Sequence, residues 1–441
     1  MIFNGMPVYS INVLLLLQIL ISTALANQAL YLDTDRLAAQ VRLDEALDPE
    51  TTEINVGTYI FRSDNTGIFA LALMREVARR GGQARLMMDW LETKLSRHRL
   101  TRDQVEYLRA EGLDIRVFGR PRWSDLAHPI QLFRSFNNRM HVKVIVFNRD
   151  RAIFGGRNIA DDYFFPMRNR KIVERLQHYA DREVFVRGEL AEKTHEYFMS
   201  LWNGPHVDPY ADLTSFVPDR AAQDEFAARL DAAMEVIRKL QGRKAWKERV
   251  MKLDEARFVA DEPGHPEGSR TTQALVEMLS GAKKRAAIVS PYIVLTEELE
   301  AAIQVALTRG VEVEVLTAHA ASSEVSVFQT AFEADIEKMK AMGVTVWQFR
   351  YFKSLHAKIV TVDEDQLYIG SYNFDPRSQL FNIELGAILR DQELTETVSR
   401  DISRLTQFSG MREKAQRVRQ MFGADCVIHL ISNTPLVRRF L

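Results

Sequence analysis

The 441-residue chain contains one cysteine, Cys426. A single cysteine excludes an intramolecular disulfide and a metal cluster held by several thiolates. The chain also has no excess of charge of either sign, because 58 Lys and Arg residues balance 59 Asp and Glu residues. It therefore lacks the overall positive field that attracts non-specific nucleic-acid-binding proteins to their ligand. An anionic ligand must instead meet positive charge that is concentrated locally.

Charge is missing from the start of the chain as well, where the first charged side chain is Asp33. Val13 to Ile21 is almost wholly aliphatic and is followed by Ala24-Leu25-Ala26, a small-x-small pattern typical of a signal-peptide cleavage site. We expect residues 1–26 to be a signal peptide or a membrane anchor, and the protein to be exported or associated with the cell membrane. No Lys or Arg precedes the apolar run, which leaves a buried first helix as the alternative.

Two parts of the chain repeat the same order of elements. A helical pattern from Leu71, a glycine and the strand Ala84 to Met88 correspond to a helical pattern from Leu299, a glycine and the strand Val311 to Leu316. A second helix, glycine and strand follow in each part, at 107–118 and 336–349. Alternating strands and helices favour an α/β sandwich with a mixed sheet in each half.

The repeat divides the chain. We expect a first half at residues 45–205 and a second half at 273–410. Between them, residues 206–272 contain loop signals on both sides of a charged helical pattern at 220–257, which predicts a connecting region with a solvated helix. Residues 411–441 form a basic and apolar tail that either docks on the protein or lies on a membrane.

Each half ends in the same chemical string. The first is His141-Val142-Lys143 followed by Gly155-Gly156-Arg157-Asn158, and the second is His356-Ala357-Lys358 followed by Gly370-Ser371-Tyr372-Asn373. In both, the asparagine follows the histidine by 17 residues, a spacing that suits a hairpin. Side chains two apart on a strand share a face, so each histidine lies beside its lysine.

This set of side chains suits the chemistry of a phosphodiester. A neutral imidazole can attack phosphorus, and a second, protonated imidazole can donate to the leaving oxygen. Two ammonium groups and two amides can hold the non-bridging oxygens, so we expect neither a metal nor another cofactor. One His-x-Lys pair alone would be an exposed strand pair, but two at matched positions predict a shared pocket.

The second half reads His-x-Lys, then Asp363, then Gly-Ser-x-Asn, and in this it resembles the phospholipase D superfamily. With Gly-Gly-Arg-Asn in the first half and Phe-Asp-Pro-Arg-Ser at 374–378, it is most similar to bacterial cardiolipin synthases. The resemblance implies two similar α/β sandwich halves with mixed sheets packed around a shared active site. It also implies transfer or hydrolysis of glycerophospholipids through a phosphohistidine.

The resemblance extends to individual site residues. It implies catalytic roles for His141, Lys143, His356 and Lys358, with one histidine as nucleophile, commonly that of the first motif, and the other as general acid. It also implies a carboxylate that orients each histidine: Asp181 for His141, with Glu183 as the substitute, and Glu384 for His356. Substrate-binding candidates are Gly156, Asn158, Ser371 and Asn373.

The first motif departs from the family pattern at two positions. Asn148 stands where the family has Asp, and Gly156 where it often has Ser. Asn148 lies an odd number of residues from His141, so on a regular strand it faces away from the site and forms structural hydrogen bonds. A binding protein without activity, which rests on Asn148 alone, is the alternative that this departure leaves open.

The first half also carries an insertion at 120–139 that mixes arginines with Trp123, Phe133 and Phe136. Such a segment suits a lipid headgroup and interface, or a stacked nucleic acid, or an ordinary surface loop. We expect a phospholipid substrate and a bacterial membrane surface as partners, with nucleic acid disfavoured by the balanced charge. The competing activity is that of a nuclease or phosphodiesterase of the same superfamily.

Overall fold

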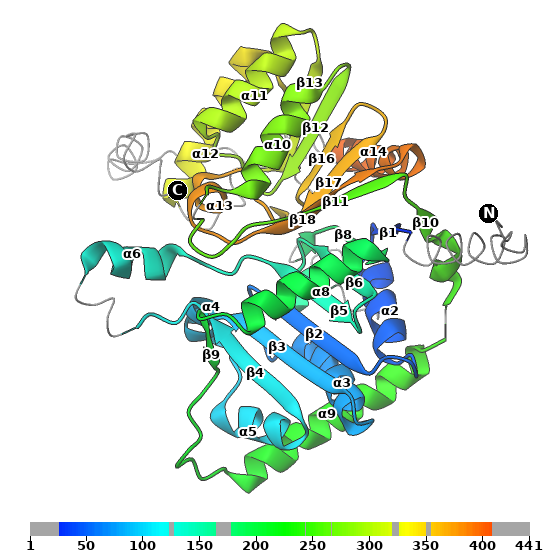
Figure 1. Ribbon diagram of the computed structural model, residues 1–441, viewed down its shortest axis with the longest axis vertical. Coiled ribbons are helices and arrows are strands. Elements are labelled where there is room, and N and C mark those ends of the chain that lie inside the picture. The colour runs from blue at the N-terminus through cyan, green and yellow to red at the C-terminus, as the bar shows by residue number, and fades with distance from the viewer. Residues whose placement is uncertain are drawn as a thin grey trace, which may run out of the picture.

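The computed structural model describes residues 26–122, 128–164, 178–242, 244–265, 267–319, 326–349 and 354–407 (Figure 1). The expected leader, apart from residue 26, the tail at 411–441 and Trp123 lie outside the described residues. Within the described residues, none of the helices combines the length and apolar character that crossing a membrane requires.

The first half is built on a nine-stranded mixed sheet of order β10-β1-β8-β6-β5-β2-β3-β4-β9. The strands β2, β3 and β4 are parallel and the other pairings are antiparallel. The strands are β1 (Gln28–Leu32), β2 (Glu53–Thr58), β3 (Gln83–Asp89), β4 (Leu113–Phe118), β5 (Lys143–Phe147), β6 (Arg151–Gly155), β8 (Glu183–Arg187), β9 (Val207–Pro209) and β10 (Met251–Lys252).

Helices cover the outer face of this sheet and enclose one hydrophobic core with it. They are α2 (Asp35–Ala46), α3 (Asn65–Arg79), α5 (Arg102–Ala110) and α9 (Arg220–Leu240). Local signals fix their starts: the Asp64 side chain accepts from Gly67 N at the start of α3, and Thr101 forms a capping box with Gln104 at the start of α5. Two short helices, α4 (Trp90–Leu95) and α6 (Pro129–Asn137), lie toward the second half.

The second half has a seven-stranded mixed sheet of order β11-β18-β17-β16-β12-β13-β14. Its strands are β11 (Glu255–Ala260), β12 (Arg285–Ser290), β13 (Glu312–Ala318), β14 (Thr345–Phe349), β16 (Ile359–Val362), β17 (Gln366–Gly370) and β18 (Leu385–Arg390). Three helices, α10 (Arg270–Gly281), α11 (Glu297–Thr308) and α12 (Ser326–Met342), pack on its outer side, and α13 (Pro376–Leu380) precedes β18.

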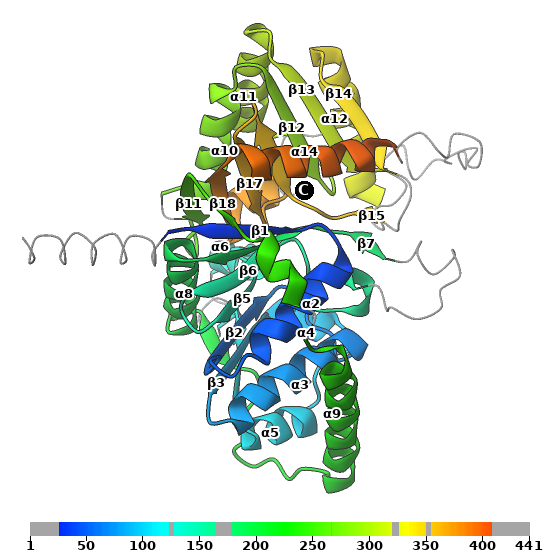
Figure 2. The same cartoon turned by 90° about the vertical axis from the view of Figure 1, so that its right-hand side faces the viewer.

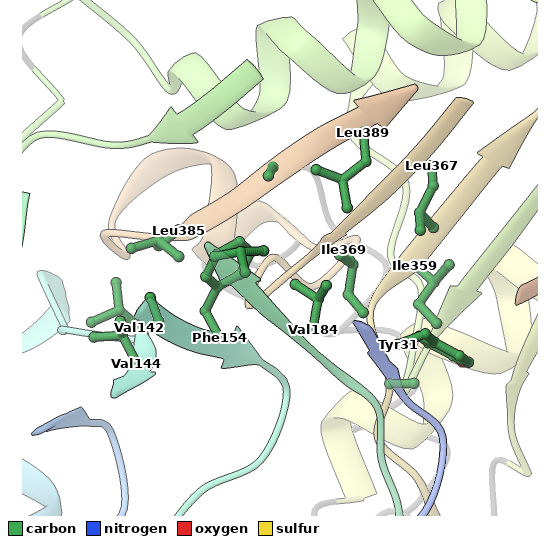
Figure 3. Packing of buried hydrophobic residues seen from close by; sticks show 14 of the residues in the cluster. Tyr31, Val142, Val144, Phe154, Val184, Ile359, Leu367, Ile369, Leu385 and Leu389 are labelled. Atoms are coloured by element: carbon green, nitrogen blue, oxygen red, sulfur yellow. The ribbon is translucent and has the colours of Figure 1, made fainter. Parts of the chain in front are cut away.

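A shared core joins the halves. The inner faces of both sheets contribute buried side chains to one cluster, among them Phe154 and Val184 from the first half and Ile369 and Leu385 from the second (Figure 3). Two further helices flank this core, α8 (Glu189–Trp202) and α14 (Gln392–Gln407). Figure 2 shows β1 between the two bodies, and its Tyr31 hydroxyl donates to Asp401 of α14 over 2.9 Å. The halves therefore fold as one unit rather than as separate domains.

The limits of the halves differ from the sequence expectation. Before residue 45, β1 and α2 already belong to the first half. The segment 206–272 is not a connector: α9 packs its apolar side into the first-half core, β10 extends the first sheet and β11 is the edge strand of the second. The helix predicted over 220–257 ends at Leu240, ahead of Gly242 with its φ of +99°.

Candidate active site

The two motifs occupy corresponding hairpins. His141 lies just ahead of β5, which turns into β6 and leads to Asn158, and His356 lies just ahead of β16, which turns into β17 and leads to Asn373. Each hairpin pairs with the first parallel strand of its sheet, β2 or β12. The same local pattern therefore produces the same local structure twice.

The turn residues hold each hairpin against its sheet and point away from the histidines. Asn148 has a φ of +53° and Asp363 a φ of +54°, a conformation that Asn and Asp tolerate better than most residues. The Asn148 side chain accepts from Thr52 N and Glu53 N and donates to Glu50 O. Asp363 accepts from three successive backbone N–H groups, at 283–285. Asn148 thus has the structural role that strand alternation predicts.

Two short backbone pairings cross from one half to the other. Met140 is bridged in parallel to Ile383, and the two-residue strand β15 (Ser354–Leu355) pairs in parallel with β7 (Tyr179–Ala180). As a result, His141 N donates to Ile383 O over 3.1 Å, and His356 N donates to Ala180 O over 2.8 Å. His141 directly follows Met140, whose bridge partner Ile383 directly precedes Glu384. In the same way, His356 directly follows Leu355, whose partner Ala180 directly precedes Asp181.

This crossing overturns the expected pairing of histidines with carboxylates. His141 Nδ1 lies 2.9 Å from Glu384 Oε1, and His356 Nδ1 lies 2.7 Å from Asp181 Oδ2. The assignment of Asp181 to His141 and of Glu384 to His356 was wrong, because each carboxylate reaches across the interface. Glu183, the substitute, instead contacts Arg42 and Arg157. An ionised carboxylate only accepts, so the Nδ1 that it contacts carries the proton and the Nε2 of that imidazole keeps its lone pair.

Two lysines supply the local positive charge that the whole chain lacks. Lys143 and Lys358 are buried, and each ammonium donates to the carbonyl oxygen of the histidine two residues earlier. Burial lowers the pKa of Lys358 to about 8. Burial and the nearby charge of Lys358 hold the pKa of Lys143 well below its usual value. Two ammonium groups held in one buried site provide the concentrated positive charge that suits an anionic ligand.

Both imidazoles are neutral in this environment. Burial, followed by the charge of Lys358, lowers the pKa of His356 to about 3. Burial and the charges of Lys143 and Lys358 also hold the pKa of His141 well below 6.5. A neutral imidazole whose Nδ1–H is fixed by a carboxylate presents Nε2 as a nucleophile or a base.

The two carboxylates have different surroundings. Burial raises the pKa of Glu384 to about 7, although it accepts from the hydroxyls of Ser371 and Ser378 over 2.5 and 2.7 Å. Burial also opposes ionisation of Asp181, but contacts with His356 and the charge of Lys358 bring its pKa below the usual value. The two carboxylates therefore match in geometry but differ in the direction in which their pKa is shifted.

The two asparagines at matched spacing both form hydrogen bonds with protein groups. Asn158 Oδ1 accepts from Ile60 N over 3.0 Å, and its side chain also hydrogen-bonds Tyr163. Asn373 Nδ2 donates to the Tyr292 hydroxyl over 3.0 Å. Gly156 and Ser371, the other two substrate-binding candidates, lie at the ends of β6 and β17 beside Asp181 and Glu384.

Comparisons with known proteins agree with this arrangement. Residues 275–406 match the family model described as cardiolipin synthase, PLD-like domain. Cardiolipin synthase C of Escherichia coli is 26% identical over 83% of this chain and 81% of that protein. A cardiolipin synthase of Halalkalibacterium halodurans is 25% identical over 83% of this chain, but this match spans 64% of the relative's length.

The chain is thus similar to the phospholipase D superfamily, through the match at 275–406 and through its curated relatives. Its fold is also that of a phosphatidylserine synthase of Haemophilus influenzae, with a TM-score of 0.68 at 16% identity over 94% of this chain and 95% of that one. The expected fold class, two phospholipase D-like α/β halves with mixed sheets, is confirmed.

Sequence reasoning missed the aromatic residues that surround the histidines of this candidate site. The Tyr59 ring lies edge-on to His141 at 5.0 Å and under the Lys143 ammonium at 5.1 Å. Tyr163 and Tyr179 contact His356 at 5.1 and 5.2 Å. None of these tyrosines lies within a motif string, so no spacing signal marks them.

In the described part of the chain, no group of three or more potential ligand side chains has a metal-binding arrangement.

Proposed function

We propose that this protein is a phospholipase D-type phosphatidyltransferase of the cardiolipin synthase kind, acting on glycerophospholipids through a phosphohistidine. The observation that carries the proposal is the pair of crossed contacts, His141 with Glu384 and His356 with Asp181. Together they orient two imidazoles in one site that holds two buried lysines. The similarity to cardiolipin synthases supports a phosphatidyl group as the unit transferred.

In the first step, Nε2 of one histidine attacks phosphorus and forms a P–N bond while the P–O bond to the leaving alcohol breaks. The other histidine donates its proton to the departing oxygen. In the second step an acceptor hydroxyl gives its proton to that same histidine and attacks phosphorus, which releases the nucleophile. The family resemblance favours His141 as the nucleophile and His356 as the acid and base.

The proton for the leaving group depends on the substrate. Burial, followed by the charges of the lysines, lowers the pKa of both imidazoles. A bound phosphodiester anion offsets that positive charge and makes protonation of one imidazole easier. The lysines therefore have two roles in the proposal: they hold the non-bridging oxygens, and they keep the nucleophile deprotonated until an anion arrives.

The insertion supplies a surface for lipid. On α6, Phe133 and Phe136 are 40% and 41% exposed. Phe133 packs against Phe381 of the second half at 5.8 Å, and Phe136 lies 6.4 Å from Trp90 of α4. We call Phe133, Phe136, Phe381 and the 43% exposed Leu380 the apolar rim. This rim spans both halves through the contact of Phe133 with Phe381, and we propose that it contacts the bilayer and limits competing water.

Product analysis tests the proposal. Phosphatidylglycerol vesicles are incubated with the protein, with and without added glycerol, and the lipids are separated by thin-layer chromatography beside a plasmid-nicking assay. We expect cardiolipin and released glycerol, with added glycerol reversing the reaction, and no nicking. Phosphatidic acid as the sole product would indicate hydrolysis instead of transfer, and nicked plasmid would favour a nuclease. The His141→Ala and His356→Ala variants are the inactive controls.

A further inference from the structure

A backbone N–H group at corresponding positions of the two halves has a different hydrogen-bond acceptor in each half. In each, the residue after the carboxylate has an N–H that points toward the loop carrying Gly156 or Ser371. The loops have the same register, because Gly156 N donates to Arg182 O over 3.1 Å and Ser371 N donates to Leu385 O over 2.9 Å. A buried N–H of this kind needs an acceptor.

In the first half the carboxylate itself is the acceptor. Arg182 N donates to Asp181 Oδ1 over 2.7 Å, while Oδ2 of the same group contacts His356. Asp181 reaches this position only because residue 156 has no side chain. A Cβ atom at Gly156 would lie 2.1 Å from Asp181 Oδ1 and 2.8 Å from its Oδ2, far closer than any real contact.

In the second half a serine hydroxyl occupies the corresponding place. Leu385 N donates to Ser371 Oγ over 3.0 Å, and that hydroxyl donates to Glu384 Oε2 over 2.5 Å. The longer glutamate leaves room for the hydroxyl between itself and the backbone. Its Oε1 still reaches His141 Nδ1 at 2.9 Å.

We propose that the pair Gly156 and Asp181 and the pair Ser371 and Glu384 are two alternative ways of positioning a histidine. Replacing both members of one pair by those of the other preserves the position of the histidine, whereas replacing one member alone disturbs it. Gly156 is then a positioning residue, which acts through Asp181 on His356. Ser371 has the same role for His141, through Glu384. This inference deepens the proposed function and rests on it for its kinetic test, but not for its structural test.

The first half offers the sharper exchange. Gly156→Ser alone forces Asp181 away from His356, and Asp181→Glu alone places a longer side chain without the hydroxyl that should separate it from the backbone. We expect each single variant to lower kcat about 100-fold with little change in KM, the effect of displacing a positioned group by about 1 Å. Gly156→Ser/Asp181→Glu recreates the second-half arrangement and should recover kcat to within about tenfold of the parent protein.

Two readouts separate this inference from the proposed function. One is kcat on phosphatidylglycerol vesicles. The other needs no turnover: the Tm of each variant and the ¹⁵N resonance of His356 Nδ1, which should move in both single variants and return in the double variant. Gly281→Ser, at a helix end with open space around its Cβ position, is the matched control and should change neither.

The outcomes are distinct. If the parent protein turns over no lipid while Tm and the His356 resonance follow the expected pattern, the proposed function fails. The inference that the two residue pairs are exchangeable then still holds. A double variant that is no better than the worse single variant, or that fails to fold, overturns the exchange. So does a Gly156→Ser variant with parental kcat and an unmoved His356 resonance.

Discussion

His141 Nδ1 lies 2.9 Å from Oε1 of Glu384, a residue 243 positions later in the chain, and His356 makes the reciprocal contact with Asp181, 175 positions earlier. Neither half therefore contains a complete histidine and carboxylate pair. The two halves must pack correctly for either imidazole to adopt its tautomer, because the carboxylate that fixes each Nδ1–H belongs to the opposite half.

The crossed contacts can be observed directly. Glu384→Gln should shift the imidazole ¹⁵N resonances of His141 and leave those of His356 nearly in place, because the amide weakens the acceptor at His141 only. Asp181→Asn should do the reverse. Spectra of selectively labelled protein at neutral pH measure both effects, with His98 on the surface as the internal control. The opposite pattern would mean that each carboxylate serves the histidine of its own half.

Asn148→Asp should leave kcat/KM within about twofold of the parent protein, because the side chain contacts backbone groups at 50–53 rather than the site. Aspartate keeps the acceptor and loses the donor to Glu50 O, a cost of about 1 kcal/mol in the free energy of unfolding. Kinetics and urea unfolding measure the two quantities. A loss of several orders of magnitude in kcat/KM would contradict the structural role of Asn148, and Asp363→Asn is the matched exchange in the second half.

The pH dependence follows from Lys358. Burial lowers its pKa to about 8, so its ammonium is charged below that pH and becomes neutral as the pH rises through it. A neutral amine no longer attracts phosphate, and kcat/KM should therefore fall above about pH 8. Lys358→Arg should move this fall to higher pH, because a guanidinium stays protonated. The pH profile of kcat/KM reports the free enzyme.

The exposed Lys284→Arg exchange is the control for this profile and should not move it. A fall above pH 8 that is identical in the parent protein and in Lys358→Arg would assign it to another group. Movement in Lys143→Arg alone would identify Lys143, whose pKa burial also lowers.

The apolar rim should contribute to binding of bilayers and not to the chemical steps. Phe133→Ala/Phe136→Ala removes two half-exposed rings worth about 1 kcal/mol each at an interface, so vesicle affinity should drop about 30-fold. Activity on vesicles should fall with it, while turnover of a short, water-soluble phosphodiester stays unchanged. We expect Trp123→Ala to add to the effect. Vesicle sedimentation and the two activity assays measure these quantities.

Trp347→Ala provides a matched control, because this aromatic residue is 40% exposed on β14 at the far edge of the second sheet. It should leave vesicle binding unchanged. Equal losses on vesicles and on the soluble substrate in the α6 variant would mean that the insertion supports folding or the site itself.

Much of the candidate site could be predicted from the sequence because the information is local. The His-x-Lys spacing places both side chains near the start of one strand, and the odd spacing to Asn148 places the amide on the other side. The crossed pairing was not readable in this way. Asp181 and Glu384 each lie just ahead of the strand that pairs with the hairpin of their own motif, and only the contact between sheets determines which histidine each one reaches.

The region 206–272 was misread for a related physical reason. Its charged helical pattern favours solvent on most sides, yet one apolar stripe through Phe226, Leu230 and Ile237 is buried against the first half. The strand at 255–260 follows without a strong turn signal and alternates only partly, as an edge strand does. Long-range packing decided both outcomes.

The shared core bears on how such a protein arises. If each half supplies the carboxylate for the other, a chain with one motif would satisfy its histidine only by meeting a second copy of itself. The present active site then corresponds to a dimer interface enclosed within one polypeptide. Within one polypeptide, the two sides can differ in sequence as long as they remain complementary, as the glycine in one loop and the serine in the other do.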